Sequence, residues 1–428
     1  MRTSRIASLL LCVFAMTTIN AQIQGKNINI LVQPDHADWT YRVGETANFK
    51  VSVLQSGVPL KNAMVQYESG PVLYTGQKNH TTLKKGTMQW KGKMDKPGFY
   101  TLKVTAHING HDYEGKSTVG FSPEKIAPAT QCPDDFDDFW KHTLEAAKQH
   151  CLQPTMRLLP ERCTNEAYVY EISFVNDRPG SRIYGILSMP VKAGQYPALL
   201  RVPGAGVRPY GGDTYTAPGK AVVLEIGIHG IPVTMSQHVY DDLQHGALDG
   251  YWDCNLENRE RNYYKRVVTG AVRAIDYLAT LPQWDHHTLG VTGSSQGGFL
   301  SLATAALDNR VTFIGVVHDA MCDYESEMKG VAGGWPHYFY KQDKINVARM
   351  TGARYYDGVN FARRCNVPAW FSFGFNDEVV PPTSSYGVYN IYPGTKTLSV
   401  YPMTGHFWFQ EQWDEWQSWI RHQLGVDK

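Results

Sequence analysis

The 428-residue chain has no excess of charge of either sign, because 41 lysine and arginine residues are balanced by 40 aspartate and glutamate residues. A protein that mainly binds nucleic acid or anionic membranes would usually carry a clear excess of positive charge. After residue 16 the chain also lacks any apolar run approaching the roughly 20 residues that a membrane helix needs. We therefore expect no nucleic-acid partner and no membrane anchor.

Metal-ligand patterns are also lacking. No C-x-x-C pair or paired-histidine motif accompanies the cysteines. His286 and His287 are adjacent, but they precede an expected strand and are interpreted as a turn. Cys132, Cys151 and Cys163 are close enough in sequence to pair locally in an oxidising compartment. We expect no metal site, and the disulfide connectivity stays open.

The first 21 residues are typical of a secretory signal peptide. Arg2 and Arg5 precede an apolar run over residues 6–16, and the more polar stretch that follows ends at Ala21. This run is too short to span a bilayer comfortably. The sequence therefore predicts an exported protein, periplasmic or secreted, with cleavage near Ala21.

Residues 22–121 alternate short strand-like segments with turn signals, among them the hairpin dipeptide Asn109-Gly110. This spacing predicts a small all-β, immunoglobulin-like sandwich domain, although no Cys…Trp…Cys core is present. The expected strands cover residues 29–32, 47–54, 63–67, 86–91, 100–107 and 117–121.

A proline-containing linker at 122–129 leads to a second expected domain, residues 130–428. It should open with a helix near Pro133, because acidic residues complement the dipole in its first turn. Alternating strands and helices then predict an α/β fold with a doubly wound, mostly parallel sheet. The strands are expected at 168–174, 182–189, 198–202, 221–226, 313–318, 369–374 and 397–401, and the helices at 263–281 and 409–424.

The segment from Thr288 to Gly298, TLGVTGSSQGG, carries the most information. It runs from an apolar strand through a G-x-S-x-G turn into a helix expected over 298–307. On a strand–turn–helix, this pattern is the nucleophile elbow of α/β-hydrolases, which projects a serine Oγ from the sheet edge. The helix N-terminus favours developing negative charge at the same point. We therefore expect an α/β-hydrolase with Ser295 as its nucleophile.

A nucleophilic serine needs a base and an orienting carboxylate, which follow in the order Ser, Asp or Glu, His in this fold. Asp377 comes just after the expected strand 369–374, and His406 comes just after the strand 397–401. Both loops can reach the elbow from the carboxyl ends of their strands. The sequence therefore predicts His406 as general base and Asp377 as its partner.

Other titratable residues compete for these roles. His318, Asp319 and Asp323 follow the strand after the elbow, and Glu378 is adjacent to Asp377 but is expected to point elsewhere. For Asp377 and His406, the ordinary alternative is a capped or satisfied turn residue. The joint pattern is more specific than any one member of it.

An oxyanion hole is the second requirement of acyl transfer. One donor should be the backbone N–H of Gln296, and the other should come from the loop Pro203-Gly204-Ala205-Gly206. Ala205 is the first choice for that donor and Gly206 the second. The glycines could equally form a plain turn.

Together these motifs resemble the acetyl xylan esterase and cephalosporin C deacetylase family of carbohydrate esterases, from Pro133 to the C-terminus. The likeness rests on YYKRVV at 263–268, AVRA at 271–274, LP at 281–282, GVTGSSQGG at 290–298 and the Asp377 and Gly405-His406 loops. The resemblance implies removal of acetyl groups from acetylated xylan, xylo-oligosaccharides or small acetylated sugars. It also implies an acetyl-Ser295 intermediate and no metal or other cofactor.

The chain departs from the family pattern at two places. Residues 227–232 read GIHGIP where the family usually has Arg-Gly-Gln, and Phe407 replaces the glutamate that usually follows the histidine. The oligomeric state stays open, with a homo-oligomer as one alternative. The resemblance implies a small acyl pocket, so Gln296, the Pro203-Gly204-Ala205 loop and the aromatic residues around Tyr210 and Trp408 are expected to close over the acetyl methyl. The alternatives are another ester or peptide hydrolase of this fold, and a carbohydrate-binding or assembly protein with a vestigial hydrolase domain.

Overall fold

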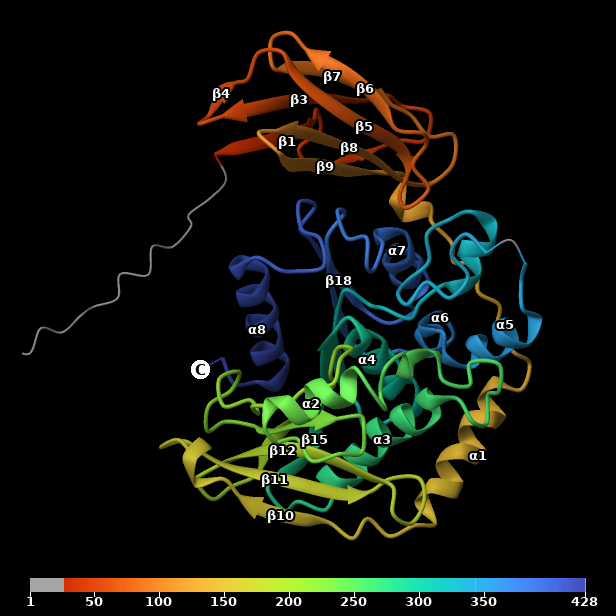
Figure 1. Cartoon of the computed structure of the whole chain (residues 1–428). Coiled ribbons are helices and arrows are strands. Elements are labelled where there is room, and N and C mark those ends of the chain that lie inside the picture. The colour runs from red at the N-terminus through yellow and green to blue at the C-terminus, as the bar shows by residue number, and fades with distance from the viewer. Residues whose placement is uncertain (1–26, 343, 428) are drawn as a thin grey trace, which may run out of the picture.

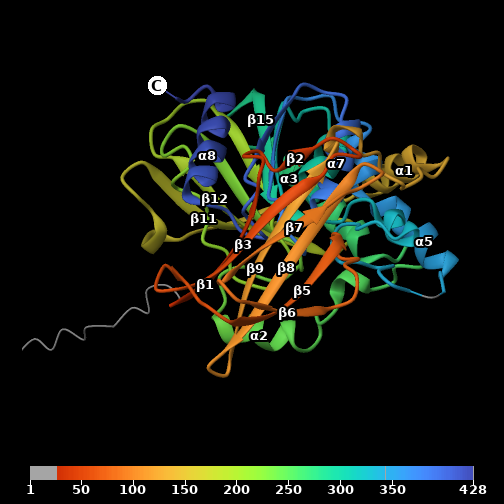
Figure 2. The same cartoon turned by 90° about the horizontal axis from the view of Figure 1, so that it is seen from above.

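The computed structural model describes residues 27–342 and 344–427, and the expected signal peptide lies outside them. A β-sandwich at the N-terminal end lies over an α/β region, and a connecting segment runs down from one to the other (Figures 1 and 2). This arrangement confirms the predicted fold class, an α/β-hydrolase preceded by an all-β sandwich.

The sandwich consists of two largely antiparallel sheets. Its core forms because alternate residues point inward, such as Phe49 and Val51 from one sheet and Leu102 and Val104 from the other. All six expected strands are present. The structure has three further strands that the sequence did not predict: β2 and β4 are only two residues long, and β6 is polar. One sheet contains β1 (Ile28–Pro34), β3 (Ala47–Gln55), β4 (Val58–Pro59) and β7 (Thr87–Gly92); the other contains β2 (Thr40–Tyr41), β9 (His111–Phe121), β8 (Gly98–Ile108), β5 (Ala63–Pro71) and β6 (Asn79–Leu83).

A nine-stranded sheet forms the centre of the α/β region. Its first pairings, from β10 to β14, are antiparallel, and every later pairing is parallel. The strand β10, only four residues long and exposed throughout, was missed by the sequence prediction. In order across the sheet the strands are β10 (Thr155–Leu158), β11 (Ala167–Val175), β12 (Arg182–Pro190), β14 (Val222–Gly227), β13 (Tyr196–Arg201), β15 (Trp284–Ser294), β16 (Phe313–Val317), β17 (Ala369–Phe373) and β18 (Lys396–Val400).

Helices cover both faces of this sheet, as expected for a doubly wound fold. Leu199 and Leu200 of β13 point to opposite faces: Leu199 packs in a cluster with Trp416 of α8, and Leu200 packs in the main cluster with Val267 of α3. Figure 1 shows α8 apart from α1, α3 and α4. The helices are α1 (Phe136–Lys148), α2 (Gln237–Gln244), α3 (Tyr263–Leu278), α4 (Gln296–Leu307), α5 (Val347–Ala353), α6 (Gly358–Ala362), α7 (Pro382–Ile391) and α8 (Gln410–Leu424).

Two expectations need correction. His286 and His287 lie within the bounds of β15 rather than before it, although the positive φ of His286, 59°, gives that segment a turn-like backbone. The local cysteine pairing is also not found, because all six described cysteines are free. Cys163 packs against β11 at the Val169 N–H, whereas Cys132 lies beside Arg364, so the two thiols belong to different parts of the fold.

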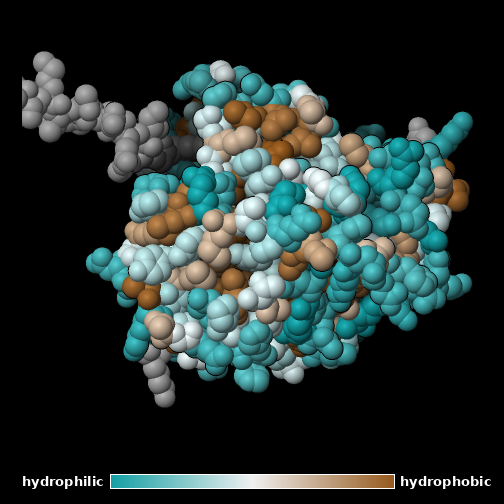
Figure 3. Space-filling model, turned by 90° about the horizontal axis from the view of Figure 1, so that it is seen from below, coloured by the Kyte–Doolittle hydropathy of each residue, from teal (hydrophilic) through white to brown (hydrophobic). Residues whose placement is uncertain are grey.

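Within the described residues, no helix combines the length and the apolar character required to cross a membrane. On the face seen from below, hydrophobic residues form small groups among hydrophilic ones (Figure 3). Single exposed apolar residues and small patches of this kind are ordinary for a folded protein surface.

Candidate active site

The elbow has the geometry that the sequence predicts. Ser295 stands between the end of β15 and the start of α4, with φ 62° and ψ −123°, a conformation that is strained for a residue with a side chain. A Cβ added at Gly293 would lie 2.4 Å from the carbonyl oxygen of Val202, and one at Gly297 would lie 2.5 Å from the same atom. Glycine is therefore required on both sides of Ser295. The helix begins two residues earlier than the sequence prediction.

The structure brings Ser295, His406 and Asp377 into one hydrogen-bonded chain. His406 Nε2 lies 3.0 Å from Ser295 Oγ, and His406 Nδ1 lies 2.8 Å from Asp377 Oδ2. The other carboxylate oxygen, Asp377 Oδ1, accepts hydrogen bonds from the N–H groups of Val379 and Val380 at 2.9 and 2.8 Å. This arrangement fixes Nδ1 as the protonated nitrogen and leaves Nε2 free to accept the serine proton.

His318 is the fourth side chain at this point. It is buried, and its Nδ1 lies 3.3 Å from Asp377 Oδ2, although neither ring nitrogen makes a well-directed hydrogen bond to a described residue. Burial opposes ionisation of Asp377, but the contacts with His318 and His406 outweigh it, and the pKa of Asp377 lies well below its ordinary value. The carboxylate is therefore ionised and can hold the histidine.

The competing acidic residues lie in other environments. Asp319 is buried with both carboxylate oxygens unpartnered among the described residues, and burial raises its pKa to about 7. Asp323 accepts hydrogen bonds from the N–H groups of Ala129 and Thr130 at 2.7 and 2.9 Å, so it holds the connecting segment. Glu378 points away from His406 toward Lys116, at 2.9 Å.

The two expected oxyanion donors flank Ser295. Ala205 lines the same cavity as Ser295, and Gln296 is the first residue of α4. Among the described residues, nothing accepts a hydrogen bond from either N–H, so both are available to a ligand. Gly206, the second choice, instead donates its N–H to the Tyr251 hydroxyl at 3.2 Å. The geometry therefore favours Ala205 over Gly206.

The side chain of Gln296, which was expected to close over the acetyl methyl, is instead buried in a hydrogen-bond network and does not line the cavity over Ser295. Its Oε1 accepts hydrogen bonds from the hydroxyls of Tyr251 and Tyr264 at 2.9 and 2.8 Å. Its Nε2 donates to the carbonyl of Pro203 at 3.2 Å. One amide thus links the start of α4 to the loop that carries Ala205.

His229 also holds this loop, and its only sign in the sequence is the GIHGIP departure at 227–232. Its Nε2 lies 3.1 Å from the carbonyl oxygen of Gly206, and its Nδ1 lies 2.8 Å from the Tyr263 hydroxyl. Burial, with the nearby charges of Arg266 and Arg208, lowers the pKa of His229 to about 4. The neutral ring therefore donates through Nε2 and accepts through Nδ1.

A cavity of about 690 Å³ opens over Ser295 and His406. Its wall includes the rings of Tyr251, Trp252, Trp335 and Trp408, together with polar groups such as Arg208 and Asp249. Trp408 is therefore near the site, as expected. The expectation for Tyr210 is wrong, because this ring packs with Val233 and Ile186 in a separate apolar cluster.

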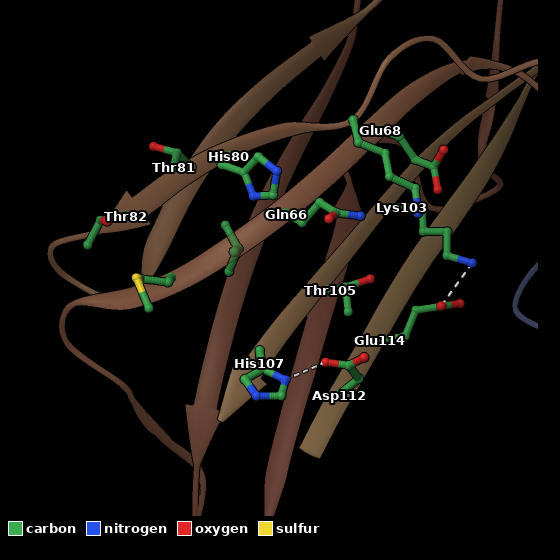
Figure 4. A pocket seen from close by; sticks show the side chains of 13 residues that line it. Gln66, Glu68, His80, Thr81, Thr82, Lys103, Thr105, His107, Asp112 and Glu114 are labelled. Carbon is green, nitrogen blue, oxygen red and sulfur yellow. Dashed lines mark hydrogen bonds and ion pairs between the residues drawn. The ribbon is translucent and has the colours of Figure 1, made fainter. Parts of the chain in front are cut away.

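A larger hollow, of about 810 Å³, lies on the outer face of the sandwich (Figure 4). Its polar side chains come from β5, β6, β8 and β9, and several are paired with each other, as in the Lys103–Glu114 contact at 2.8 Å and the His107–Asp112 contact at 2.8 Å. None of Ser295, Asp377 and His406 lines it. The hollow therefore has no visible part in acyl transfer.

One group of described residues could hold a metal ion: His318, Asp377 and His406, whose ligand atoms lie within 4.8 Å of one another. Two of these residues already bind each other through the 2.8 Å hydrogen bond. A metal bound there would replace that bond and remove the orientation of His406.

Comparisons with known proteins identify the family of the chain. A model of the acetyl xylan esterase (AXE1) family matches residues 124–422. The acetyl esterase Axe7A of Xylanibacter ruminicola is 37% identical over 402 residues, which cover 92% of this chain and 90% of that protein.

Two solved structures share the fold at lower identity. The acetyl xylan esterase from Paenibacillus sp. R4 has a TM-score of 0.61 at 22% identity, covering 71% of this chain and 98% of that one. Acetyl xylan esterase 1 from Thermoanaerobacterium sp. JW/SL YS485 has a TM-score of 0.59 at 22% identity, covering 72% and 98%.

Proposed function

This chain belongs to the acetyl xylan esterase family and is a carboxylic ester hydrolase, and from that premise we propose that it removes O-acetyl groups from acetylated xylan, xylo-oligosaccharides and small acetylated sugars. The observation that carries the proposal is the chain of contacts from Ser295 Oγ through His406 to Asp377 at the floor of an open cavity.

In the first half of the proposed reaction, Ser295 Oγ attacks the acetyl carbonyl carbon while His406 Nε2 takes the hydroxyl proton. Asp377 stabilises the imidazolium that forms. The N–H groups of Ala205 and Gln296 donate to the oxyanion of the tetrahedral intermediate. Collapse of that intermediate breaks the ester bond, and the departing sugar oxygen takes the proton from His406. The product on the enzyme is acetyl-Ser295.

In the second half, a water molecule attacks the acetyl-enzyme carbonyl and gives its proton to His406 Nε2. The second tetrahedral intermediate collapses, Ser295 Oγ regains the proton, and acetate leaves. No metal takes part in this scheme. A metal on Asp377 and His406 would disrupt the base that both halves use.

The aromatic wall of the cavity supports a carbohydrate as the alcohol part of the ester. Trp252 and Trp335 present flat apolar surfaces beside charged groups such as Arg208 and Asp249. Sugar rings combine apolar faces with hydroxyl edges, and Trp suits such surfaces because it combines a large apolar body with a polar N–H. Phe407 and Phe409, which precede and follow Trp408 in the chain, are both exposed, with ring centroids 5.8 Å apart.

We also propose that the chain is exported after cleavage near Ala21, and that residues 22–121 and 130–428 are the two domains of the mature protein. The expected signal sequence supports the first statement. Separate hydrophobic clusters in the sandwich and the α/β region support the second. N-terminal sequencing of protein from the periplasm or medium tests the export.

The direct test measures acetate released from acetylated xylan and from acetylated xylo-oligosaccharides by the wild-type protein and by Ser295→Ala. We expect release by the wild type and loss of at least about 10³-fold in the variant, while both keep the same melting temperature. Wild-type protein that hydrolyses a simple acetyl ester but neither carbohydrate would overturn the substrate. Full activity in Ser295→Ala would overturn the mechanism.

A further inference from the structure

Asn376, the residue directly before Asp377, connects three parts of the molecule. Its Oδ1 accepts a 2.9 Å hydrogen bond from the backbone N–H of Thr118 in β9 of the sandwich. Its Nδ2 donates to the carbonyl of Met403 at 3.3 Å, in the loop that leads to His406, and approaches the carbonyl of Lys116 at 3.5 Å. The side chain is almost completely buried.

We propose that the sandwich positions the acid of the catalytic site, and that Asn376 is the positioning residue through which it acts. The inference rests on the proposed role of Asp377 as the partner of His406. It assigns to the N-terminal region a part in the hydrolytic reaction itself, in addition to any part in folding or substrate binding.

The loop that carries Asp377 and the loop that carries His406 are hydrogen-bonded to each other along their backbones. The position of Asn376 therefore affects both loops. Phe375 N–H donates to the carbonyl of Pro402 at 3.2 Å, and Asn376 N–H donates to that of Thr404 at 3.1 Å. A Cβ added at Gly374 would lie 2.1 Å from the Thr404 carbonyl oxygen, so the two loops are in close contact. A shift of Asn376 would therefore move both Asp377 and the segment before His406.

The sandwich that holds Asn376 lies above β18 and α7 of the α/β region (Figure 1) and packs against that region through aromatic rings. Phe99 of β8 packs edge-on against Phe375, with ring centroids 4.9 Å apart, and also against Tyr386 of α7 at 5.6 Å. These rings belong to one buried cluster together with Val72 and Phe373. Apolar packing in such a cluster is dense and holds β8 in place. Because β9 pairs with β8, with Thr118 opposite Thr101, the cluster also supports the N–H that binds the amide.

Lys116 and Glu378 lie on the other side of Asp377 and join the same two regions. Their charged groups are 2.9 Å apart, but the side chain of Glu378 is 40% exposed. Solvent screens such a pair, and its contribution is small. The buried amide of Asn376 therefore carries the coupling, and the ion pair is secondary.

Asn390 provides a matched control at the same interface. Its Nδ2, on α7, also donates to two backbone carbonyls, those of Pro123 and Ile126, at 2.9 Å each. Asn376→Ala and Asn390→Ala thus each remove a partly or fully buried amide between the connected regions, but only Asn376 touches the acid and histidine loops.

The experiment measures kcat and KM on a soluble acetyl ester, and the melting temperature, for the full mature chain and both variants. We expect Asn376→Ala to lower kcat by about 10- to 100-fold with KM within about twofold, as a misplaced catalytic group does. We expect Asn390→Ala to keep kcat within about twofold of the wild-type value. Its melting temperature should fall at least as much as that of Asn376→Ala.

A double-mutant cycle separates positioning from a general loss of structure. In an Asp377→Asn background, Asn376→Ala should lower the remaining kcat less than twofold, because the orientation that it supports is already lost. An equal loss of kcat in both backgrounds, or kcat values that match for Asn376→Ala and Asn390→Ala, would overturn the inference. If Asp377→Asn itself keeps wild-type kcat, the proposed role of Asp377 fails instead.

Discussion

Gln296 Nε2 donates a hydrogen bond to the carbonyl oxygen of Pro203, 3.2 Å away. The residue that follows the nucleophile thereby holds the loop that carries Ala205. Both proposed oxyanion donors belong to this one unit, because Gln296 supplies its own N–H and sets the position of the second. Tyr251 completes the unit: it donates to Gln296 Oε1 and accepts from Gly206 N–H.

The first prediction concerns this unit. Gln296→Met keeps the backbone N–H and a similar volume, but it removes the bond to Pro203 and leaves the hydroxyls of Tyr251 and Tyr264 without their acceptor. We expect kcat to fall by about 10- to 100-fold and stability to fall by about 1–3 kcal/mol, the cost of buried polar groups without partners. Steady-state kinetics and thermal unfolding measure the two effects.

Gln412→Met is the control for that variant. Gln412 is also buried, and its Nε2 donates to Ser372 Oγ at 2.7 Å, away from the loop that carries Ala205. It should lose stability but keep kcat within about twofold. Equal kcat in the two variants would show that the Gln296 side chain does not support the oxyanion donors.

The second prediction distinguishes the acidic residues. Asp377→Asn should lower kcat by up to about 10⁴-fold while the fold is retained, because His406 would lose its correct tautomer. Asp319→Asn and Asp323→Asn should retain kcat within about tenfold, since neither side chain contacts His406. Measurement of kcat for each variant, with circular dichroism to check that it is folded, distinguishes these acidic residues. A large loss confined to Asp319→Asn or Asp323→Asn would reassign the acid.

Much of this site follows from local sequence. The G-x-S-x-G turn needs glycine at 293 and 297 because backbone atoms approach there, so the elbow is recognisable in the sequence itself. Asp377 and His406 follow buried strands, and parallel strands bring their carboxyl ends to one edge. Their convergence on Ser295 could therefore be predicted, whereas their catalytic role stays a prediction.

The parts that were missed depend on contacts between distant segments. His229 holds Gly206 only because β14 ends near the loop after β13, and no local pattern encodes that pairing. The contact of Asn376 with Thr118 joins residues 258 positions apart. The polar strand β6 lacks the apolar alternation that marks a strand. The strand β10 alternates but is only four residues long and exposed throughout, so its pattern is too short to stand out.

The third prediction concerns stability and pH. Burial raises the pKa of Asp319 to about 7, from an ordinary value of 3.8. Between these values the folded state binds more protons than the unfolded state, so this residue lowers the stability as the pH rises from about 4 to about 7. Asp319→Asn should therefore become more stable relative to wild type across that range, by a few kcal/mol at pH 8 compared with pH 4.

Chemical denaturation at a series of pH values measures the difference. A constant difference between Asp319→Asn and wild type from pH 4 to pH 8 would mean that Asp319 does not titrate in this window.

The fourth prediction is covalent labelling. A fluorophosphonate should attach to Ser295, because the contact with His406 Nε2 at 3.0 Å activates its hydroxyl. Peptide mass spectrometry locates the adduct, and Asp377→Asn should react more slowly than wild type. Activity should survive a chelator. An adduct on another residue, or activity lost to a chelator and restored by zinc, would contradict the serine mechanism.

The last prediction concerns the acyl group. Trp408 lines the cavity beside Ser295 and His406, where it can enclose the acetyl methyl, and each overpacked group costs about 1–3 kcal/mol. Among p-nitrophenyl esters, kcat/KM should therefore fall from acetyl to butyryl to octanoyl. Trp408→Ala should raise the butyryl-to-acetyl ratio by about tenfold, because it opens that wall. Trp413→Ala is the control: its ring stacks on Trp408 at 5.9 Å but does not line the cavity. Rates that rise with chain length in the wild type would contradict an acetyl-sized pocket and would favour a lipase-like or peptidase-like specificity.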